Sequence, residues 1–132
     1  MTSVLLRHAA AGDKRHWTGD DWLRPLDARG RRQAAELVEL LRPLKVRRVV
    51  TSPYVRCVET VEPLAEALGL PLEQDDRLGE GMGRAAADLL REDGVLCCTH
   101  GDVVDALLGT DLKKGAAVVL EDDEVVREIP AP

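Results

Sequence analysis

The chain has 132 residues, of which 45% are hydrophobic and 32% are charged, and its formal net charge is −6 at pH 7. This length and balance predict one globular domain spanning residues 1–132, with a core of Leu, Val and Ala because Phe is absent. The acidic charge argues against nucleic-acid binding, and the longest apolar runs are far shorter than the roughly 20 residues of a membrane span.

The chain contains three cysteines, Cys57, Cys97 and Cys98. Their number is odd, two of them are adjacent, and no CxxC pair is present, so neither a disulfide framework nor a zinc site is indicated. The first residues lack the basic segment that precedes the apolar part of a signal peptide. We therefore expect reduced, mostly buried thiols in a cytoplasmic protein.

The first part of the chain predicts a strand, a helix and a second strand. An apolar strand over residues 3–7 leads into a polar loop over 9–26. Asp27 is a typical residue for the N-terminal cap of a helix, and apolar residues at helical spacing predict that helix over about 28–42. Residues 46–51 form the second predicted strand.

Proline and glycine set the limits of the next elements. Pro53 suits the first turn of a helix whose apolar face continues to Gly69. Pro63 lies inside this helix and should kink it or split it in two. Residues 71–75 then suit a short edge strand, and residues 84–91 suit a short helix.

The last part of the chain predicts a strand over 95–99, a helix over 103–108 and a hairpin formed by 116–120 and 125–129. Strands thus alternate with helices along the chain. This order indicates an α/β fold, a three-layer sandwich with a mainly parallel central sheet. Ligands of such sheets bind beyond the carboxyl ends of the strands.

Five polar residues fall just past predicted strand ends, in three separate segments of the chain. They are Arg7, His8, Ser52, Arg56 and His100. Because the carboxyl ends of parallel strands meet at one edge, we expect two imidazoles and two guanidinium groups to line one cavity. Such a cavity suits a tetrahedral anion, since the planar guanidinium fork matches phosphate oxygens.

A phosphoryl group in this cavity suggests a role for each side chain. The neutral ring of His8 would attack phosphorus and form a covalent phosphohistidine. A backbone carbonyl of the loop 9–12 is a candidate acceptor for its other ring nitrogen. The phosphoryl oxygens would be held by Arg7, Arg56 and His100.

Glu80, which lies between two glycines, is the best placed acid for protonating the oxygen of an ester leaving group. The leaving nitrogen of a phosphoramidate can carry its own proton, so dependence on Glu80 would report on the substrate class. No spacing of His, Cys, Asp or Glu residues matches a metal motif, so we expect no metal.

Three motifs, in chain order, resemble those of the histidine phosphatase superfamily. Residues 7–9 (Arg-His-Ala) resemble its Arg-His-Gly signature, and residues 99–101 (Thr-His-Gly) resemble its second-histidine motif. Residues 51–60 resemble its second-arginine motif, in which Ser-Pro precedes the Arg and Thr follows four residues later. The resemblance covers about residues 3–108 and implies the phosphoglycerate-mutase-like fold without a large cap domain.

The chain most resembles the compact SixA-like branch, which acts on protein phosphohistidine. It is also similar to the phosphatase-like C-terminal domain of some Nudix hydrolases. The resemblance implies that His8 is the nucleophile and Glu80 the acid, and that no metal or other cofactor is needed. The phosphate ligands that it implies are Arg7, Arg56 and His100.

The chain departs from the family pattern near the first motif. Ala9 stands where the family usually has Gly, and the Asn often found several residues later is missing, because the chain has no Asn. Arg15 and His16 are candidates for its place. Together with Ser52, they are the residues that we expect to face the substrate.

The expected function is that of a metal-independent phosphatase. Its partner would be a phosphohistidine protein or a phosphorylated small molecule, such as a phosphate monoester. The sequence leaves two alternatives open. One is a non-catalytic module that binds phosphate and senses a ligand, and the other is a phosphomutase.

Overall fold

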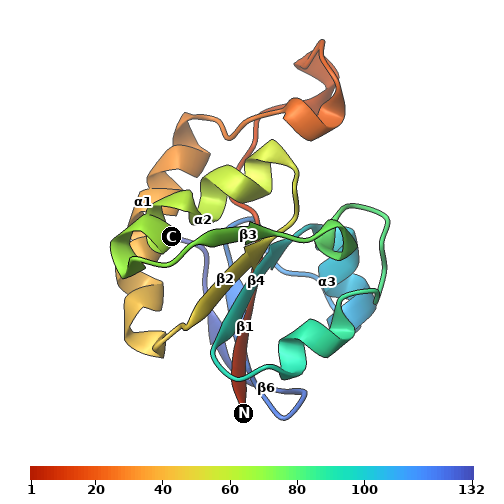
Figure 1. Cartoon of the computed structure of the whole chain (residues 1–132). Helices are drawn as coiled ribbons and strands as arrows, with labels where there is room; N and C mark the ends of the chain where they lie inside the picture. The colour runs from red at the N-terminus through yellow and green to blue at the C-terminus, as the bar shows by residue number, and fades with distance from the viewer.

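Six strands form one sheet in the computed structural model, which describes residues 1–132 (Figure 1). The strand order is β3-β2-β4-β1-β5-β6. The bounds are β1 Thr2–Arg7, β2 Arg48–Thr51, β3 Leu72–Gln74, β4 Val95–Thr99, β5 Ala117–Glu121 and β6 Glu124–Ile129. The first four strands of this order run parallel, whereas β5 pairs antiparallel with both β1 and β6. The mainly parallel sheet and the last hairpin are therefore confirmed.

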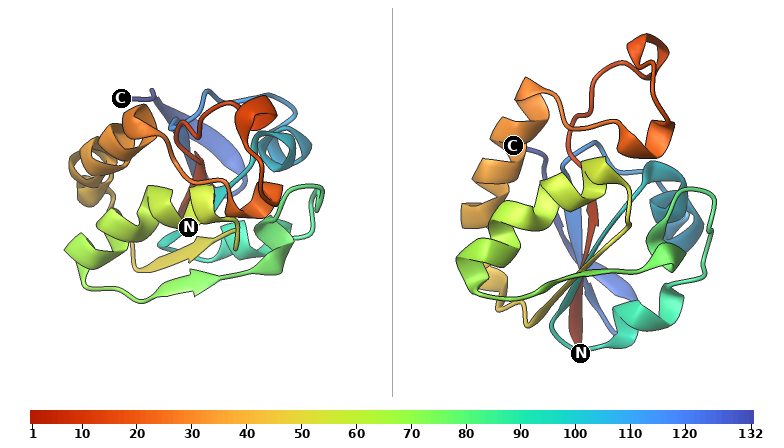
Figure 2. Two further views of the ribbon diagram at one scale, coloured as in Figure 1. Left: turned by 90° about the horizontal axis from the view of Figure 1, so that it is seen from above. Right: turned by 45° about the horizontal axis from the view of Figure 1, so that its top comes forward.

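Helices cover both faces of the sheet (Figure 2). Helices α1 (Ala28–Leu41) and α2 (Val55–Leu68) pack on one face. The other face carries α3 (Gly101–Leu108) and the 3₁₀ helix η5 (Ala87–Arg91). This arrangement is the expected three-layer α/β sandwich.

Side chains that alternate along each strand contribute to a hydrophobic core on both faces of the sheet. Val4 and Leu6 of β1 pack toward α1 and α2, whereas Leu5 packs toward α3. Successive strand side chains point to opposite faces, so a strand covered on both sides is apolar at every position. The cysteines are buried and unpaired, as predicted.

Local signals place the helix ends where they were predicted. Asp27 caps α1, because its Oδ1 accepts a hydrogen bond from the backbone N–H of Gly30 at 2.8 Å. Gly30 also permits close packing on the segment after β1, since a Cβ there would lie 1.9 Å from the carbonyl oxygen of Ala10. Gly69 ends α2 in the left-handed conformation, with φ at 68°.

Pro53 lies outside α2, in contrast to the prediction. Of the two outcomes expected at Pro63, the split does not occur and the kink stays a prediction. The helix begins at Val55, after Pro53 rather than with it, and it continues through Pro63 without being split. Proline removes one backbone hydrogen bond. Pro63 lies beside the buried stripe that holds Val61 and Leu64 in the core, and packing of that stripe keeps the helix continuous.

Two further helices differ in extent from the prediction. Helix α3 begins at Gly101, two residues before the predicted start. The prediction missed Gly101 and Asp102 because neither has an apolar side chain that would extend the hydrophobic periodicity. The segment 84–91 contains only the short 3₁₀ helix η5. None of the helices combines the length and the hydropathy that crossing a bilayer requires.

The carboxyl ends of β1, β2 and β4 meet at one edge of the sheet. Parallel pairing of β4 with both neighbours fixes their register. Beyond the strands, His8 N donates to Thr99 O and Ser52 N donates to Cys98 O, each at 3.0 Å. The three predicted motifs are therefore brought together at this edge.

Candidate active site

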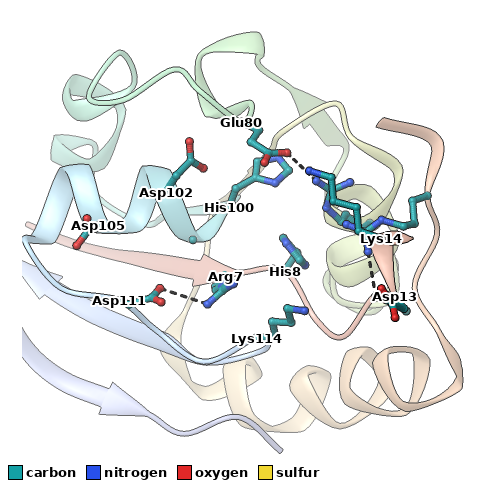
Figure 3. A pocket seen from close by; sticks show the side chains of 14 residues that line it. Arg7, His8, Asp13, Lys14, Glu80, His100, Asp102, Asp105, Asp111 and Lys114 are labelled. Atoms are coloured by element: carbon teal, nitrogen blue, oxygen red, sulfur yellow. Dashed lines mark hydrogen bonds and ion pairs between the residues drawn. The ribbon is translucent and has the colours of Figure 1, made fainter. Parts of the chain in front are cut away.

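A pocket of about 880 Å³ opens at this edge of the sheet (Figure 3). No hydrophobic side chain lines it. The lining residues include five that the sequence predicted: Arg7, His8, Arg56, Glu80 and His100. These five side chains, from four separate segments, therefore share one cavity.

His8 follows β1 and is only 5% exposed. Its Nδ1 donates to the carbonyl oxygen of Ala9 at 2.8 Å, so a backbone acceptor does lie in the predicted loop. The unprotonated nitrogen is therefore Nε2, which keeps its lone pair. Thr60 secures this backbone, because its Oγ1 accepts from Ala9 N at 3.0 Å and donates to Arg56 O at 2.7 Å.

Burial lowers the pKa of His8 from 6.5 to about 3. The hydrogen bond to Ala9 opposes this shift, while the positive charges of nearby His and Arg side chains add to it. The imidazole is therefore neutral at physiological pH. Only this form has a free lone pair for attack on an electrophile.

A buried neutral histidine predicts a loss of stability in acid. Below pH 6.5 the unfolded chain binds a proton at His8, which the folded chain does not accept until about pH 3. The free energy of unfolding therefore decreases as the pH is lowered. Protonation of His8 in the unfolded chain accounts for a decrease of about 2 kcal/mol between pH 7 and pH 5. Denaturant unfolding at both pH values measures this loss.

The matched control for this measurement is His8→Asn, which has no titrating ring. This variant should lose about 2 kcal/mol less than the wild type over the same interval. Equal losses in the two proteins would contradict a neutral, buried His8.

His100 faces His8 across the pocket, with the ring centroids 5.4 Å apart. Its Nε2 lies 2.9 Å from Ser52 Oγ and 3.6 Å from Cys57 Sγ, so one edge of the ring is fixed from behind. Tyr54 packs against the ring edge-to-face at 4.5 Å. The other ring nitrogen, Nδ1, is buried and has no hydrogen-bond partner.

Arg7 ends β1 and lies against the backbone of the second-histidine motif. A Cβ added at Gly101 would lie 2.8 Å from Arg7 Cζ, so the glycine makes room for the guanidinium group. Arg7 Nη1 donates to Asp111 Oδ1 at 3.2 Å and to the carbonyl oxygen of Leu112. Its Nε is buried and unpaired.

Arg56 lies in the first turn of α2, and its side chain is 3% exposed. Nη1 donates to Asp21 O at 2.9 Å, and Nη2 donates to Asp21 Oδ2 at 3.1 Å and to Glu80 Oε2 at 2.9 Å. Burial would raise the pKa of Asp21, but Arg56 and Arg24 lower it below its usual value. Arg56 Nε is buried without a partner.

Three residues that were expected to face the substrate lie elsewhere. Ser52 is completely buried behind His100 and does not line the pocket. Arg15 and His16 belong to the 3₁₀ helix η1 (Lys14–His16) in a loop that protrudes from the molecule (Figure 1). Their side chains, 89% and 86% exposed, pair with Asp13 and do not line the pocket.

Several charged lining residues were not predicted from the sequence. They are Asp13, Lys14, Arg24, Asp102, Asp105, Asp111 and Lys114. Most lie in loops, where charged residues are common and no pattern distinguishes those of a site. Arg24 is nevertheless 8% exposed, because its Nη1 donates to the carbonyl oxygens of Ala11 and Gly12.

Two carboxylates of the pocket pair with arginines that also line it. Asp111 pairs with Arg7, and Glu80 pairs with Arg56. No group of three His, Cys, Asp or Glu side chains in the chain lies close enough together to hold a metal ion.

Sequence comparison relates the chain to known proteins. Residues 3–89 match the family model described as histidine phosphatase superfamily (branch 1). The chain is 34% identical over 116 residues to an 8-oxo-(d)GTP phosphatase from Mycolicibacterium smegmatis, an alignment that covers 81% of this chain. The match covers 36% of that protein, so the chain spans about a third of the length of this relative.

Structural comparison finds whole-chain similarity. YhfR from Bacillus stearothermophilus has a TM-score of 0.82 at 19% identity, covering 99% of this chain and 98% of that one. The protein histidine phosphatase SixA complexed with tungstate has a TM-score of 0.76 at 23% identity, covering 98% and 97%. These likenesses confirm the expected compact fold without a large cap domain.

Proposed function

The chain belongs to the histidine phosphatase superfamily, and from this membership we propose that it is a metal-independent phosphatase acting through a phosphohistidine at His8. The proposed phosphate ligands are Arg7, Arg56 and His100. Glu80 is the proposed general acid.

One observation carries this proposal. In the whole chain, three buried side-chain nitrogens lack a hydrogen-bond partner: Arg7 Nε, Arg56 Nε and His100 Nδ1. A buried unpaired donor is costly, typically by about 1–3 kcal/mol. All three belong to residues of one pocket that also contains His8. A phosphoryl group, with its three oxygens, is the ligand that would satisfy all of them.

The first proposed step forms the enzyme intermediate. The lone pair of His8 Nε2 attacks phosphorus, and the bond from phosphorus to the leaving oxygen breaks. The leaving oxygen takes the bonding electrons and a proton from Glu80. The charge on the phosphoryl oxygens is stabilised by the guanidinium groups of Arg7 and Arg56 and by a hydrogen bond from Nδ1 of His100.

The second proposed step releases phosphate. A water molecule attacks phosphorus, the phosphorus–nitrogen bond breaks, and the electron pair returns to His8 Nε2. Glu80, left as a carboxylate by the first step, accepts the proton of the water. His8 is then neutral again, in the state that its buried setting favours.

The proposed substrates are protein phosphohistidine and small phosphate monoesters. The structural relative SixA is named as a protein histidine phosphatase and holds tungstate, which is tetrahedral like phosphate. The relative from M. smegmatis is named as an 8-oxo-(d)GTP phosphatase, which acts on a small phosphorylated molecule. Both names support phosphate release by this pocket.

Hydrolysis of an aryl phosphate in EDTA tests the proposal and separates it from its alternatives. We expect release of orthophosphate without added metal, and no transfer to a phosphorylated acceptor supplied in excess. Transfer to the acceptor would identify a phosphomutase instead. Phosphate binding with no turnover of aryl phosphate or phosphohistidine would identify a binding module.

Substitution of Glu80 by Gln should affect esters more than phosphoramidates. An alkoxide leaving group needs the proton of Glu80, whereas a phosphoramidate nitrogen carries its own, so we expect a loss of about 10²-fold for alkyl phosphates and under about 10-fold for phosphoramidates. Measurement of kcat/KM for both substrates on one protein preparation gives this comparison. Equal losses for the two would remove Glu80 from the acid role.

A further inference from the structure

Lys114, in the loop between α3 and β5, lines the pocket together with His8 and Arg7 (Figure 3). The side chain of Lys114 is exposed, and its backbone is held by the same hydrogen bonds that hold the nucleophile segment. Gln33, 2% exposed, donates from Nε2 to Lys114 O at 3.2 Å and accepts at Oε1 from Ala10 N at 2.9 Å. The next residue, Gly115, donates from its backbone N–H to His8 O at 3.0 Å.

The ammonium group of Lys114 differs from the guanidinium groups of the pocket, because it has no carboxylate partner. Each of the three lining arginines lies within 3.2 Å of a carboxylate oxygen. Lys114 forms no ion pair, and partial desolvation, together with Arg7 and Arg24, lowers its pKa. The positive charges of Arg7 and Arg24 lie near it, so an anion bound beside these three cations would be favoured.

Lys14 is the second unpaired lysine of the pocket, but it is placed less firmly. It lies in η1 of the exposed loop, and this helix buries no residue. Both side chains are exposed, but the backbone of Lys114 is held by the buried Gln33. Of the two, Lys114 is therefore the better organised to bind a fixed part of a substrate.

The pocket also has space beyond a single phosphoryl group on the side of Lys114. Lys114 and Asp111 line a second groove of about 700 Å³, which continues past Arg29, Lys113 and Glu128. The main pocket offers no hydrophobic wall to a leaving group. A polar, charged leaving group next to the scissile phosphoryl group suits these surroundings.

We propose that Lys114 binds a second phosphate adjacent to the scissile one, so that the preferred substrate is a phosphoric anhydride with a terminal phosphoryl group. This inference rests on the proposed function and extends its small-molecule substrates from phosphate monoesters to phosphoric anhydrides. The bond between the terminal phosphorus and the bridging oxygen breaks as His8 Nε2 bonds to phosphorus. The bridging oxygen leaves on the inner phosphate with the electron pair, and Lys114 offsets its charge. Water then cleaves the phosphorus–nitrogen bond.

Calorimetric titration with two stable phosphonates tests this subsite without turnover. Methylenediphosphonate presents two phosphoryl-like groups and methylphosphonate presents one, and EDTA keeps the solution free of metal. We expect the wild type to bind the diphosphonate at least about 10-fold more tightly, because a charge-assisted contact is among the stronger hydrogen bonds. In Lys114→Met the preference should fall to within about threefold, and Lys114→Arg should retain it.

Lys45→Met is the matched control, because it removes the same charge from an exposed lysine that lines neither the pocket nor the second groove. It should keep the wild-type preference for the diphosphonate. Equal affinities of the wild type for both phosphonates, or a preference that survives Lys114→Met, would overturn the subsite. Failure of the proposed function would appear separately, as absence of aryl phosphate hydrolysis by a protein that still binds the phosphonates.

Discussion

The His8→Ala variant is expected to lose phosphatase activity by roughly 10⁴-fold or more, since removal of a covalent nucleophile leaves only binding and electrostatic stabilisation. The pocket offers no substitute at this position. His100 faces it from 5.4 Å, but its Nε2 is engaged with Ser52 and its Nδ1 is the proposed donor to a phosphoryl oxygen, so neither nitrogen is placed as a second nucleophile. Initial rates with an aryl phosphate in EDTA measure the loss.

The control for this variant is His16→Ala, because His16 is 86% exposed and lies outside the pocket. We expect its rate to stay within about twofold of the wild type. Thermal unfolding of His8→Ala should show one cooperative transition, which confirms that the variant is folded. Activity of folded His8→Ala within tenfold of the wild type would refute His8 as the nucleophile.

The second large effect is expected at Arg56, whose replacement by Ala should lower kcat/KM by about 10²–10³-fold. The guanidinium group is buried and held by Asp21 and Glu80, so it needs no rearrangement to stabilise charge on a phosphoryl group. Its removal also leaves the carboxylates of Asp21 and Glu80 without this partner, and Glu80, which lines the pocket, then repels an anionic substrate. Steady-state kinetics with an aryl phosphate measure the loss.

Two further variants serve as comparisons for Arg56→Ala. Arg56→Lys keeps the charge but loses the planar fork, so we expect an intermediate loss of about 10-fold or more in a folded protein. Arg32→Ala removes an exposed arginine of α1 and should leave kcat/KM unchanged. A loss below about threefold in folded Arg56→Ala would show that Arg56 does not contact the reacting group.

Much of the fold could be predicted because its signals are local. Asp27 and Gly69 mark helix ends through their own side chain or backbone conformation, and the apolar runs of β1 and β4 mark buried strands. Pro63 shows the limit of such reasoning. Its local preference is to break a helix, but the core contacts of α2 come from the rest of the fold and outweigh it.

The site could be predicted in part, for a physical reason. Parallel strands bring their carboxyl ends together. Residues that directly follow β1 and β4 therefore lie close to one another, independently of the conformation of the loops. Position after a strand does not fix the direction of a side chain, however, and Ser52 turns beneath His100 instead of facing the pocket.

Loop residues that line the pocket through contacts with residues far away in the sequence could not be predicted. Lys114 reaches the site because Gln33, 81 residues earlier in the chain, holds its backbone. Arg24 enters because its guanidinium group satisfies carbonyl oxygens of a distant part of the same loop. Such contacts depend on the folded chain and leave no periodic pattern in the sequence.

Capture of the phosphorylated enzyme tests the central claim most directly. Wild-type protein is mixed briefly with a substrate carrying labelled phosphate and then quenched in alkali, which preserves phosphohistidine. Peptide mapping should find the label on His8 and nowhere else, and the His8→Ala variant should carry none. Steady release of phosphate by a wild type that never carries label, or label on a residue other than His8, would contradict the account.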